Sequence, residues 1–250
     1  NTLRDVIKNE LIESKDKYGD ERKTQIVEFY SDLTDEDLIP EEDLIVTLSR
    51  EGYAKTQQLD VYQSQNRGGT GKRATSFKEE DFISKLFVAN THDTLLCFSS
   101  YGKVYWIKVY RLPKGGRNAK GRPIVNLLPL EQDERIQAVL PVKEFNDNSF
   151  VFMATQSGTI KKTSLSAYSR PMKNGIKAIK LKENDKVVNV EITDGNKDIM
   201  LFADSGKSIR FSEKDARPMG RVSQGVRGMK LDKGQKVISL LVLDEGNIIT

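Results

Sequence analysis

Hydrophobic and polar residues follow two different patterns along the chain. Near the N-terminus, apolar residues recur at helical spacing, at Leu3, Val6, Ile7, Leu11 and Ile12. Gly19 is suited to end this segment, so we expect a short N-terminal helix. From Leu44 onward, short apolar runs alternate with glycine-containing turns, which is typical of β-strands.

Four stretches share an apolar strand, a turn that ends in glycine and a second strand. They are IVTLSREGYAKT, LLCFSSYGKVYW, VFMATQSGTIKK and IMLFADSGKSIR, aligned on Gly52, Gly102, Gly158 and Gly206. Glycine suits the positive φ of tight hairpin turns. A second glycine follows 17 to 19 residues later in each copy, at Gly71, Gly121, Gly175 and Gly225. A third strand-like run follows each second glycine: DFISKLFV, ERIQAVLPV, DKVVNVEIT and QKVISLLVL.

The repeat has a period of 48 to 56 residues and about four strands, which is the sequence signature of propeller-like blades. Because one blade cannot bury its own faces, the blades are expected to pack around an axis. The final GNIIT resembles the first strand of a fifth unit. We therefore expect a mainly β fold with four blades and the start of a fifth, in an arc that continues beyond this chain. The predicted segments are 1–26 (helical), 27–43 (an acidic linker or strap) and 44–250 (the blades).

Composition argues against a membrane-spanning protein, a secreted protein and a protein held together by disulfides or cysteine-bound zinc. The 250 residues are 30% charged, and no apolar run approaches the ~18 residues that span a bilayer. The polar N-terminal stretch is unlike a secretory signal, so we expect a cytoplasmic location. Cys97 is the single cysteine and His92 the single histidine, which leaves no internal disulfide and no cysteine-based zinc site. We interpret Cys97 as a core residue and His92 as part of a turn.

The net charge of +4 hides a periodic distribution. The section after each hairpin glycine is basic, with formal charges of +3, +7, +5 and +4 in residues 52–73, 102–122, 158–177 and 206–227. The intervening sections are acidic or neutral, and the first 51 residues carry −8. Since equivalent sections of packed blades face the same way, we predict a basic belt along the outer rim.

A continuous basic belt suits a long polyanion such as double-stranded DNA, whose condensed counterions are displaced by cations. Nothing in the sequence resembles a recognition helix, so we expect contacts to the DNA backbone with weak sequence preference. For Tyr105 and Trp106, packing between blades is favoured over stacking on bases. The residues predicted to contact DNA on the belt are Lys103, Arg117, Lys120, Arg122, Lys161, Lys162, Lys173, Lys177, Lys207, Arg210, Arg221 and Arg227.

No arrangement typical of catalysis is found. GGTGK lacks the strand–loop–helix context of a phosphate-binding loop, and no carboxylate cluster indicates a magnesium site. The acidic stretch DLTDEDLIPEED lacks the spacing of a calcium loop. We therefore expect a binding device without a cofactor of its own.

The chain resembles the C-terminal region of DNA gyrase A subunits from end to end. EEDFISKLFVANTHDTLLCFSSYGKVYWIKVYRLP and GRPIVNLLPLEQDERIQAVLPV are similar to the first two blades of that family. QNRGGTG matches the family's hallmark box, in which Gln65, Arg67, Gly68, Gly69 and Gly71 are kept. Asn66 and Thr70 stand where the family usually has cations, and Lys72 and Arg73 follow at once. The resemblance implies that this whole stretch, Gln65–Arg73, contributes to DNA binding.

The resemblance also implies a six-bladed β-pinwheel whose blades exchange strands, with DNA wrapped around its rim. It implies a holoenzyme of two A and two B subunits that introduces negative supercoils, with ATP and Mg²⁺ used by the holoenzyme. The DNA-cleaving tyrosine of that family belongs to a preceding region, so this chain by itself is expected to be non-catalytic. We also expect the isolated chain to be monomeric. The resemblance further implies that residues 1–26 are the end of the family's helical arm.

Two other functions fit the sequence. The C-terminal arm of the topoisomerase IV A subunit is one, because that arm has a degraded box similar to the altered one here. A propeller used as a protein-interaction scaffold is the other, and it predicts little DNA binding and little dependence on salt.

Overall fold

The computed structural model describes residues 2–21, 24, 34, 36–61, 81–116 and 119–243. The chain divides into two compact units, Asn1–Leu38 and Ile39–Thr250. The first contains helix α1 (Thr2–Tyr18), which matches the helix predicted from apolar spacing and has no buried residue. None of the described helices is long and apolar enough to cross a membrane. The boundaries predicted at residues 26 and 43 stay predictions.

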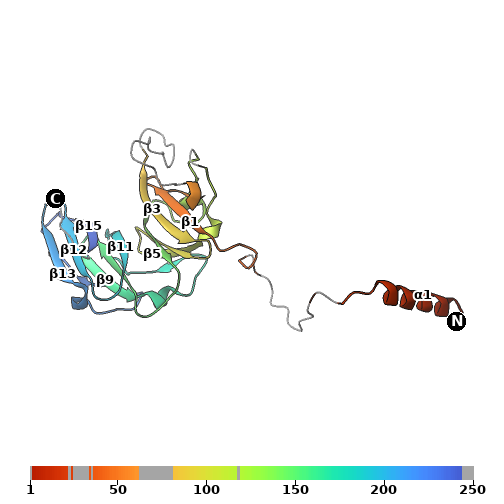
Figure 1. Ribbon diagram of the computed structural model, residues 1–250. Helices are drawn as coiled ribbons and strands as arrows, with labels where there is room; N and C mark the ends of the chain where they lie inside the picture. Colours follow the sequence, from red (N-terminus) through yellow and green to blue (C-terminus); the bar gives the residue numbers. More distant parts are fainter. Residues whose placement is uncertain are drawn as a thin grey trace, which may run out of the picture. The chain divides into compact units, whose positions relative to one another are not determined.

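The second unit consists of four antiparallel sheets, one for each repeat (Figure 1). Each repeat supplies a hairpin and a third strand that pairs with the first strand of the hairpin. These strands are β1 (Asp43–Ser49), β2 (Tyr53–Gln58) and β3 (Ile83–Asn90); β4 (Thr94–Ser99), β5 (Lys103–Lys108) and β7 (Ile136–Val142); β8 (Phe150–Thr155), β9 (Thr159–Ser164) and β11 (Val187–Thr193); β12 (Asp198–Ala203), β13 (Ser208–Ser212) and β15 (Val237–Leu243). The mainly β, propeller-like architecture predicted from the repeats is thus confirmed.

The hairpin turns are built as the glycine spacing predicts. The four aligned glycines have φ between 73° and 86°, the left-handed region that side chains with a Cβ rarely adopt. Short 3₁₀-helices follow the second strand of each hairpin, at η1 (Leu59–Val61), η2 (Val109–Arg111), η4 (Leu165–Tyr168) and η5 (Glu213–Asp215), and a further one, η3, spans Ile124–Asn126.

The fourth strand of a sheet comes from the following repeat. β6 (Arg122–Pro123) pairs with β2, β10 (Ile176–Lys177) with β5, and β14 (Val226–Arg227) with β9. The pairing continues past the short strand, because the carbonyl of Gly158 accepts hydrogen bonds from the N–H groups of Gly228 and Met229 at 2.9 and 3.1 Å. The described part of the fourth sheet holds three strands. GNIIT, the expected start of a fifth blade, lies outside the described residues.

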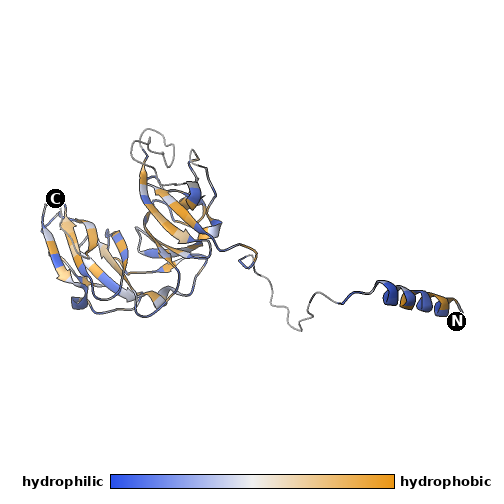
Figure 2. Cartoon of the chain, viewed as in Figure 1, coloured by the Kyte–Doolittle hydropathy of each residue, from blue (hydrophilic) through white to orange (hydrophobic). Residues whose placement is uncertain are grey.

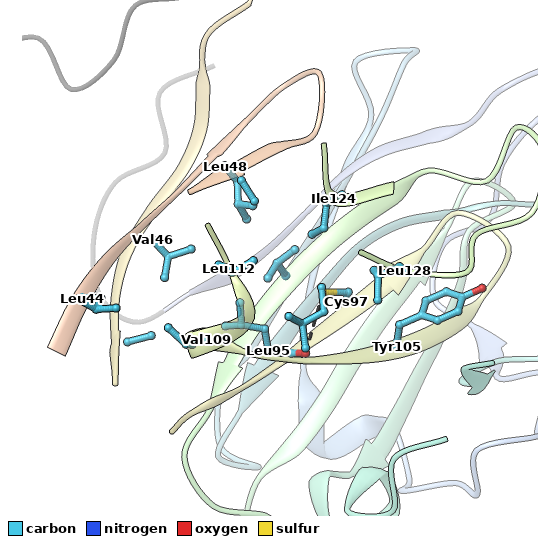
Figure 3. Packing of buried hydrophobic residues seen from close by; sticks show 14 residues of the cluster. Leu44, Val46, Leu48, Leu95, Cys97, Tyr105, Val109, Leu112, Ile124 and Leu128 are labelled. Carbon is cyan, nitrogen blue, oxygen red and sulfur yellow. Dashed lines mark hydrogen bonds between the residues drawn. The ribbon is translucent and has the colours of Figure 1, made fainter. Parts of the chain in front are cut away.

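Three hydrophobic clusters join successive sheets. Leu95 and Cys97 of β4 pack against the first sheet, whereas Leu96 and Phe98 pack against the third. Figure 3 shows the first of these clusters, with residues of β1 facing those of β4. Central strands are therefore buried on both faces, which explains why LLCF is a continuous apolar run. Figure 2 shows the resulting concentration of hydrophobic residues on the strands and the hydrophilic character of α1.

The second glycine of the second, third and fourth repeats permits the exchanged strand to approach its neighbour. Gly225 directly precedes β14 and has φ of 91°. A Cβ there would overlap the carbonyl oxygen of Ile160 in β9. Gly206, a hairpin glycine with φ of 78°, has no atom within 4 Å of the Cβ position.

This pair of glycines allows backbone strain to be separated from steric overlap. Gly206→Ala is expected to cost about 1–2 kcal/mol of unfolding free energy, because only the left-handed conformation is penalised. Gly225→Ala should cost roughly 1–3 kcal/mol more, since the added methyl group also forces β14 away from β9. Chemical denaturation of the two variants measures the difference. Equal losses would contradict a close approach at Gly225.

Candidate nucleic-acid interface

Three crossover segments carry a repeat's chain from its own blade to the preceding one. They are Arg111–Arg122, Arg170–Lys177 and Arg217–Arg227, and they end in β6, β10 and β14 respectively. Because β11 contacts both β7 and β15 at the opposite edges of the sheets, the crossovers lie at the outer edge. The segments contain five, three and three Lys or Arg residues and no Asp or Glu.

The cations of the crossover segments face solvent. Of those that the structure describes, all but Arg221, which is half-buried, are exposed, and none forms an ion pair with a described acidic residue. Of the residues predicted from the sequence, the structure places six here: Lys120, Arg122, Lys173, Lys177, Arg221 and Arg227. Together they form an uncompensated positive surface that spans successive blades.

Four exposed cations of this surface were absent from the predicted contacts. They are Arg111, Lys114, Arg170 and Arg217. Pro113, Pro171 and Pro218 occupy matching places at the start of the three crossovers, and these four cations stand within two residues of them. Aligning the repeats on these prolines is the signal that would have found them.

Three other predicted contacts are already paired; Lys207 and Arg210 are exposed, whereas Lys103 is half-buried. The Lys103 ammonium lies 2.5 Å from Glu131, that of Lys207 lies 2.7 Å from Asp232, and the Arg210 guanidinium lies 2.6 Å from Asp198. The hydrogen bond from Lys207 lowers the pKa of the Asp232 carboxyl. Exposed pairs of this kind are weak, so phosphate can compete for the cations, but their charge is partly compensated.

The prediction that Lys161 and Lys162 contact DNA is wrong for this structure. Their relative exposures are 0% and 4%, because β9 is covered on both faces. In β9, TIKKTS is polar yet five of its six residues are buried. A polar strand in a basic section suggests a solvated face, and burial on both sides by neighbouring blades overrides that expectation.

Lys162 belongs to a buried ion-pair network. Its ammonium lies 3.1 Å from a carboxylate oxygen of Glu213, which is fully buried, and 4.4 Å from the centre of the Phe150 ring. The same carboxylate accepts hydrogen bonds from the Thr193 hydroxyl and the Lys197 N–H, both at 2.7 Å. Since Glu213 begins η5, Lys162 ties β9 to the start of the Arg217–Arg227 crossover.

Lys161 has backbone partners instead of a carboxylate. Its ammonium donates hydrogen bonds to the carbonyl oxygens of Ala178, at 2.6 Å, and of Arg221. Burial, with a smaller contribution from the nearby Arg221 charge, lowers the pKa of Lys161 to about 8. The lysine is therefore held inside the fold by carbonyl dipoles at an electrostatic cost.

The aromatic residues of the belt pack between blades, as the sequence indicated. Tyr105 is 1% exposed and its hydroxyl donates to Glu134, while the Trp106 indole N–H donates to the carbonyl of Tyr168 at 2.9 Å.

The remaining candidate residues have simpler outcomes. Cys97 is fully buried, which raises the pKa of its thiol to about 12. Arg117 and the Gln65–Arg73 box lie outside the described residues. Among the residues that the structure describes, no cluster of acids, histidine and cysteine could hold a metal ion.

Comparison with known proteins agrees with this architecture. A family model described as "DNA gyrase C-terminal domain, beta-propeller" matches residues 43–90, 93–143, 149–194 and 197–244, one match for each repeat. The DNA gyrase A subunit of Salmonella typhimurium is 53% identical over 249 residues, covering 99% of this chain and 28% of the relative. The Haemophilus influenzae protein of the same name is 55% identical over 229 residues, covering 92% and 26%. The chain thus spans about a quarter of the length of these relatives.

Two solved structures share the fold. The C-terminal domain of DNA topoisomerase IV aligns with a TM-score of 0.72 at 30% identity, over 83% of this chain and 63% of that one. The DNA gyrase A C-terminal domain aligns with a TM-score of 0.61 at 28% identity, over 80% and 65%.

Replacing Lys162 by methionine is expected to reduce the unfolding free energy by about 3–5 kcal/mol. The change leaves the Glu213 carboxylate buried without its cation, which is the costly way to break a buried pair. Lys207→Met removes an exposed pair and should cost less than about 1 kcal/mol. Denaturant titrations compare the two, and similar small losses would contradict a buried pair at Lys162.

Stability should also depend on pH through Lys161. Its folded pKa, about 8, lies below the ordinary lysine value of 10.5, so between these values the unfolded chain binds more protons. The unfolding free energy should therefore rise by on the order of 1 kcal/mol from pH 7 to pH 9. In Lys161→Met this increment should be absent. An identical pH dependence in both proteins would place the titration elsewhere.

Proposed function

The chain belongs to the DNA gyrase C-terminal domain family, and we propose that it binds double-stranded DNA on the outer surface formed by its crossover segments. The observation that carries this proposal is the acid-free composition of those segments, whose exposed cations lack acidic partners among the described residues. A surface of this kind attracts the phosphate backbone, and release of the condensed counterions favours binding. Backbone contact gives little sequence preference.

The order of the crossovers supports wrapping of the DNA. Each crossover bridges two blades, so a duplex that follows the outer edge meets one basic segment after another. Smooth bending of 20–30 base pairs by 40–90° costs about 1–6 kcal/mol, which contacts to many phosphates offset. The box, Gln65–Arg73, carries the first repeat's copy of the second glycine, and we include it in the proposed surface with Arg117.

The parent enzyme is proposed to be an ATP-hydrolysing DNA gyrase. In this proposal the chain is the non-catalytic, DNA-wrapping part of the A subunit, with residues 1–26 as the end of a helical arm and 27–43 as a linker. Two A subunits and two B subunits form the holoenzyme in the bacterial cytoplasm. ATP and Mg²⁺ serve that assembly, whereas the isolated chain is proposed to be a monomer without a cofactor.

Topoisomerase IV is the second candidate for the parent enzyme. Two observations favour it: the similarity to the topoisomerase IV C-terminal domain, and the presence of Asn66 and Thr70 at positions where the gyrase box usually has cations. The complete holoenzyme, with full-length A and B subunits plus ATP, distinguishes the two. Negative supercoiling of relaxed plasmid supports gyrase, whereas decatenation without negative supercoiling would overturn it.

The DNA-binding surface is tested by removing three cations from one crossover. Arg170→Gln, Lys173→Gln and Lys177→Gln together should weaken binding to a duplex of about 100–150 base pairs. The slope of log affinity against log salt should fall by roughly 2–3 units, since each phosphate contact contributes about 0.9.

The matched control removes three exposed lysines that alternate with acids. Lys180→Gln, Lys182→Gln and Lys186→Gln change the net charge by the same amount, but Glu183 and Asp185 lie among them. This variant should retain most of the slope. Equal effects of the two triple variants would mean that net charge alone governs binding, and a flat salt dependence of the unmodified chain would favour a protein-interaction scaffold.

A further inference from the structure

In the first three blades, the third residue after the hairpin glycine meets the crossover that arrives from the following repeat. This residue is Lys55, Tyr105, Lys161 or Ile209 in the four blades. The first three side chains are 2%, 1% and 0% exposed. A Cβ at Gly175 of the second crossover would lie 2.6 Å from the Tyr105 ring, so that ring packs directly against the incoming strand. Ile209 is 38% exposed, and within the described residues no crossover covers it.

In the third blade the buried side chain reaches two crossovers at once. Ala178, whose carbonyl accepts one hydrogen bond from the Lys161 ammonium, directly follows the Arg170–Lys177 segment. Arg221, whose carbonyl accepts the other, lies within the Arg217–Arg227 segment. Three residues after the end of the first segment, the Lys180 N–H also donates to the carbonyl of Ser223 in the second, at 3.1 Å. One ammonium group therefore fixes the junction of two successive basic segments.

Lys55 makes a related contact in the first blade. Its ammonium donates to the carbonyl oxygens of Gly116 and Ala119, at 3.1 and 3.0 Å. Both acceptors lie in the Arg111–Arg122 crossover, so a buried cation again binds the backbone of a segment whose side-chain cations point to solvent. Buried lysines thus bind carbonyls inside two crossovers, Arg111–Arg122 and Arg217–Arg227, and the residue directly after the third, Ala178.

Packing of the blade does not itself require a lysine at this position. Burial of an ammonium group is costly, and Lys161 has no carboxylate partner among the described residues. Tyr105 and Ile209 occupy the same position in other blades that form the same hairpin. The lysine is distinguished from these residues by its long stem and its charged donor, which reach backbone carbonyls that an apolar side chain cannot bind.

We propose that Lys161 is a positioning residue for DNA binding: its buried ammonium sets the Arg170–Lys177 and Arg217–Arg227 segments side by side, so that their exposed cations form one continuous surface. Lys55 fixes the shape of the Arg111–Arg122 segment in the same manner. This inference rests on the proposed function, since it assigns to the crossovers the DNA contact. It gives the two lysines a part in DNA binding without contact to DNA.

The test uses Lys161→Met in the full chain, because methionine keeps an unbranched stem, one atom shorter, and removes the donor. Hydrogen exchange of the Lys180 amide should accelerate at least about tenfold, while amides of the β8–β9 pairing remain protected. The salt slope of DNA binding should fall by about 1–2 units although no exposed cation has been removed. Ile209→Met, at the same repeat position without a covering crossover, should leave both measurements unchanged.

The outcomes separate this inference from the function on which it rests. A folded Lys161→Met protein with an unchanged salt slope overturns the positioning role, provided that the unmodified chain shows a steep slope. A flat slope in the unmodified chain instead overturns the proposed function. If Lys161→Met does not fold, Lys55→Met repeats the test in the first blade, with exchange followed at the Gly115 amide, which donates to the carbonyl of Thr56. Unchanged exchange and slope in that variant overturn the inference.

Discussion

The pairing of each sheet's outer strand with a strand from the following repeat is the constraint on which the structure depends. A hairpin with its third strand leaves one edge of backbone donors and acceptors open, and β6, β10 and β14 close that edge in the first three sheets. The chain must therefore cross from blade to blade along the outer edge. The glycines at the ends of these crossovers allow the backbones to approach closely enough for pairing.

This connectivity also decides where positive charge accumulates. A crossover runs over the surface between two blades and packs through its backbone and a few apolar side chains, such as Leu112 and Ile176, so its other side chains are free to be polar. The acid-free segments occupy this position, whereas some cations elsewhere, such as Lys103 and Lys207, have carboxylate partners. The crossover segments that connect the blades are thus also the segments whose positive charge is uncompensated and could attract a polyanion.

Buried and exposed cations have different roles in this arrangement: the buried lysines hold the crossover backbone, and the exposed cations face solvent. Lys162 with Glu213 secures the start of one crossover, and Lys161 binds the backbone further along it. Exposed residues such as Arg217 and Arg227 then project from a backbone that is already fixed. Removing a buried lysine and removing an exposed arginine are consequently different perturbations, although both reduce the positive charge by one.

The sequence by itself determined the blades. Gly52 and its three counterparts, the apolar runs and the phased charge are local features, because turn geometry and strand periodicity act over a few residues. It also located most of the candidate surface, through residues such as Lys120 and Lys173. Only the tertiary structure decided that Lys161 and Lys162 are interior, because their burial comes from strands and crossovers of other repeats that cover both faces of β9. The sequence TIKKTS does not contain that information. Its lysines and threonines would suit a strand exposed to water equally well, and only the structure shows that backbone carbonyls and other strands surround them.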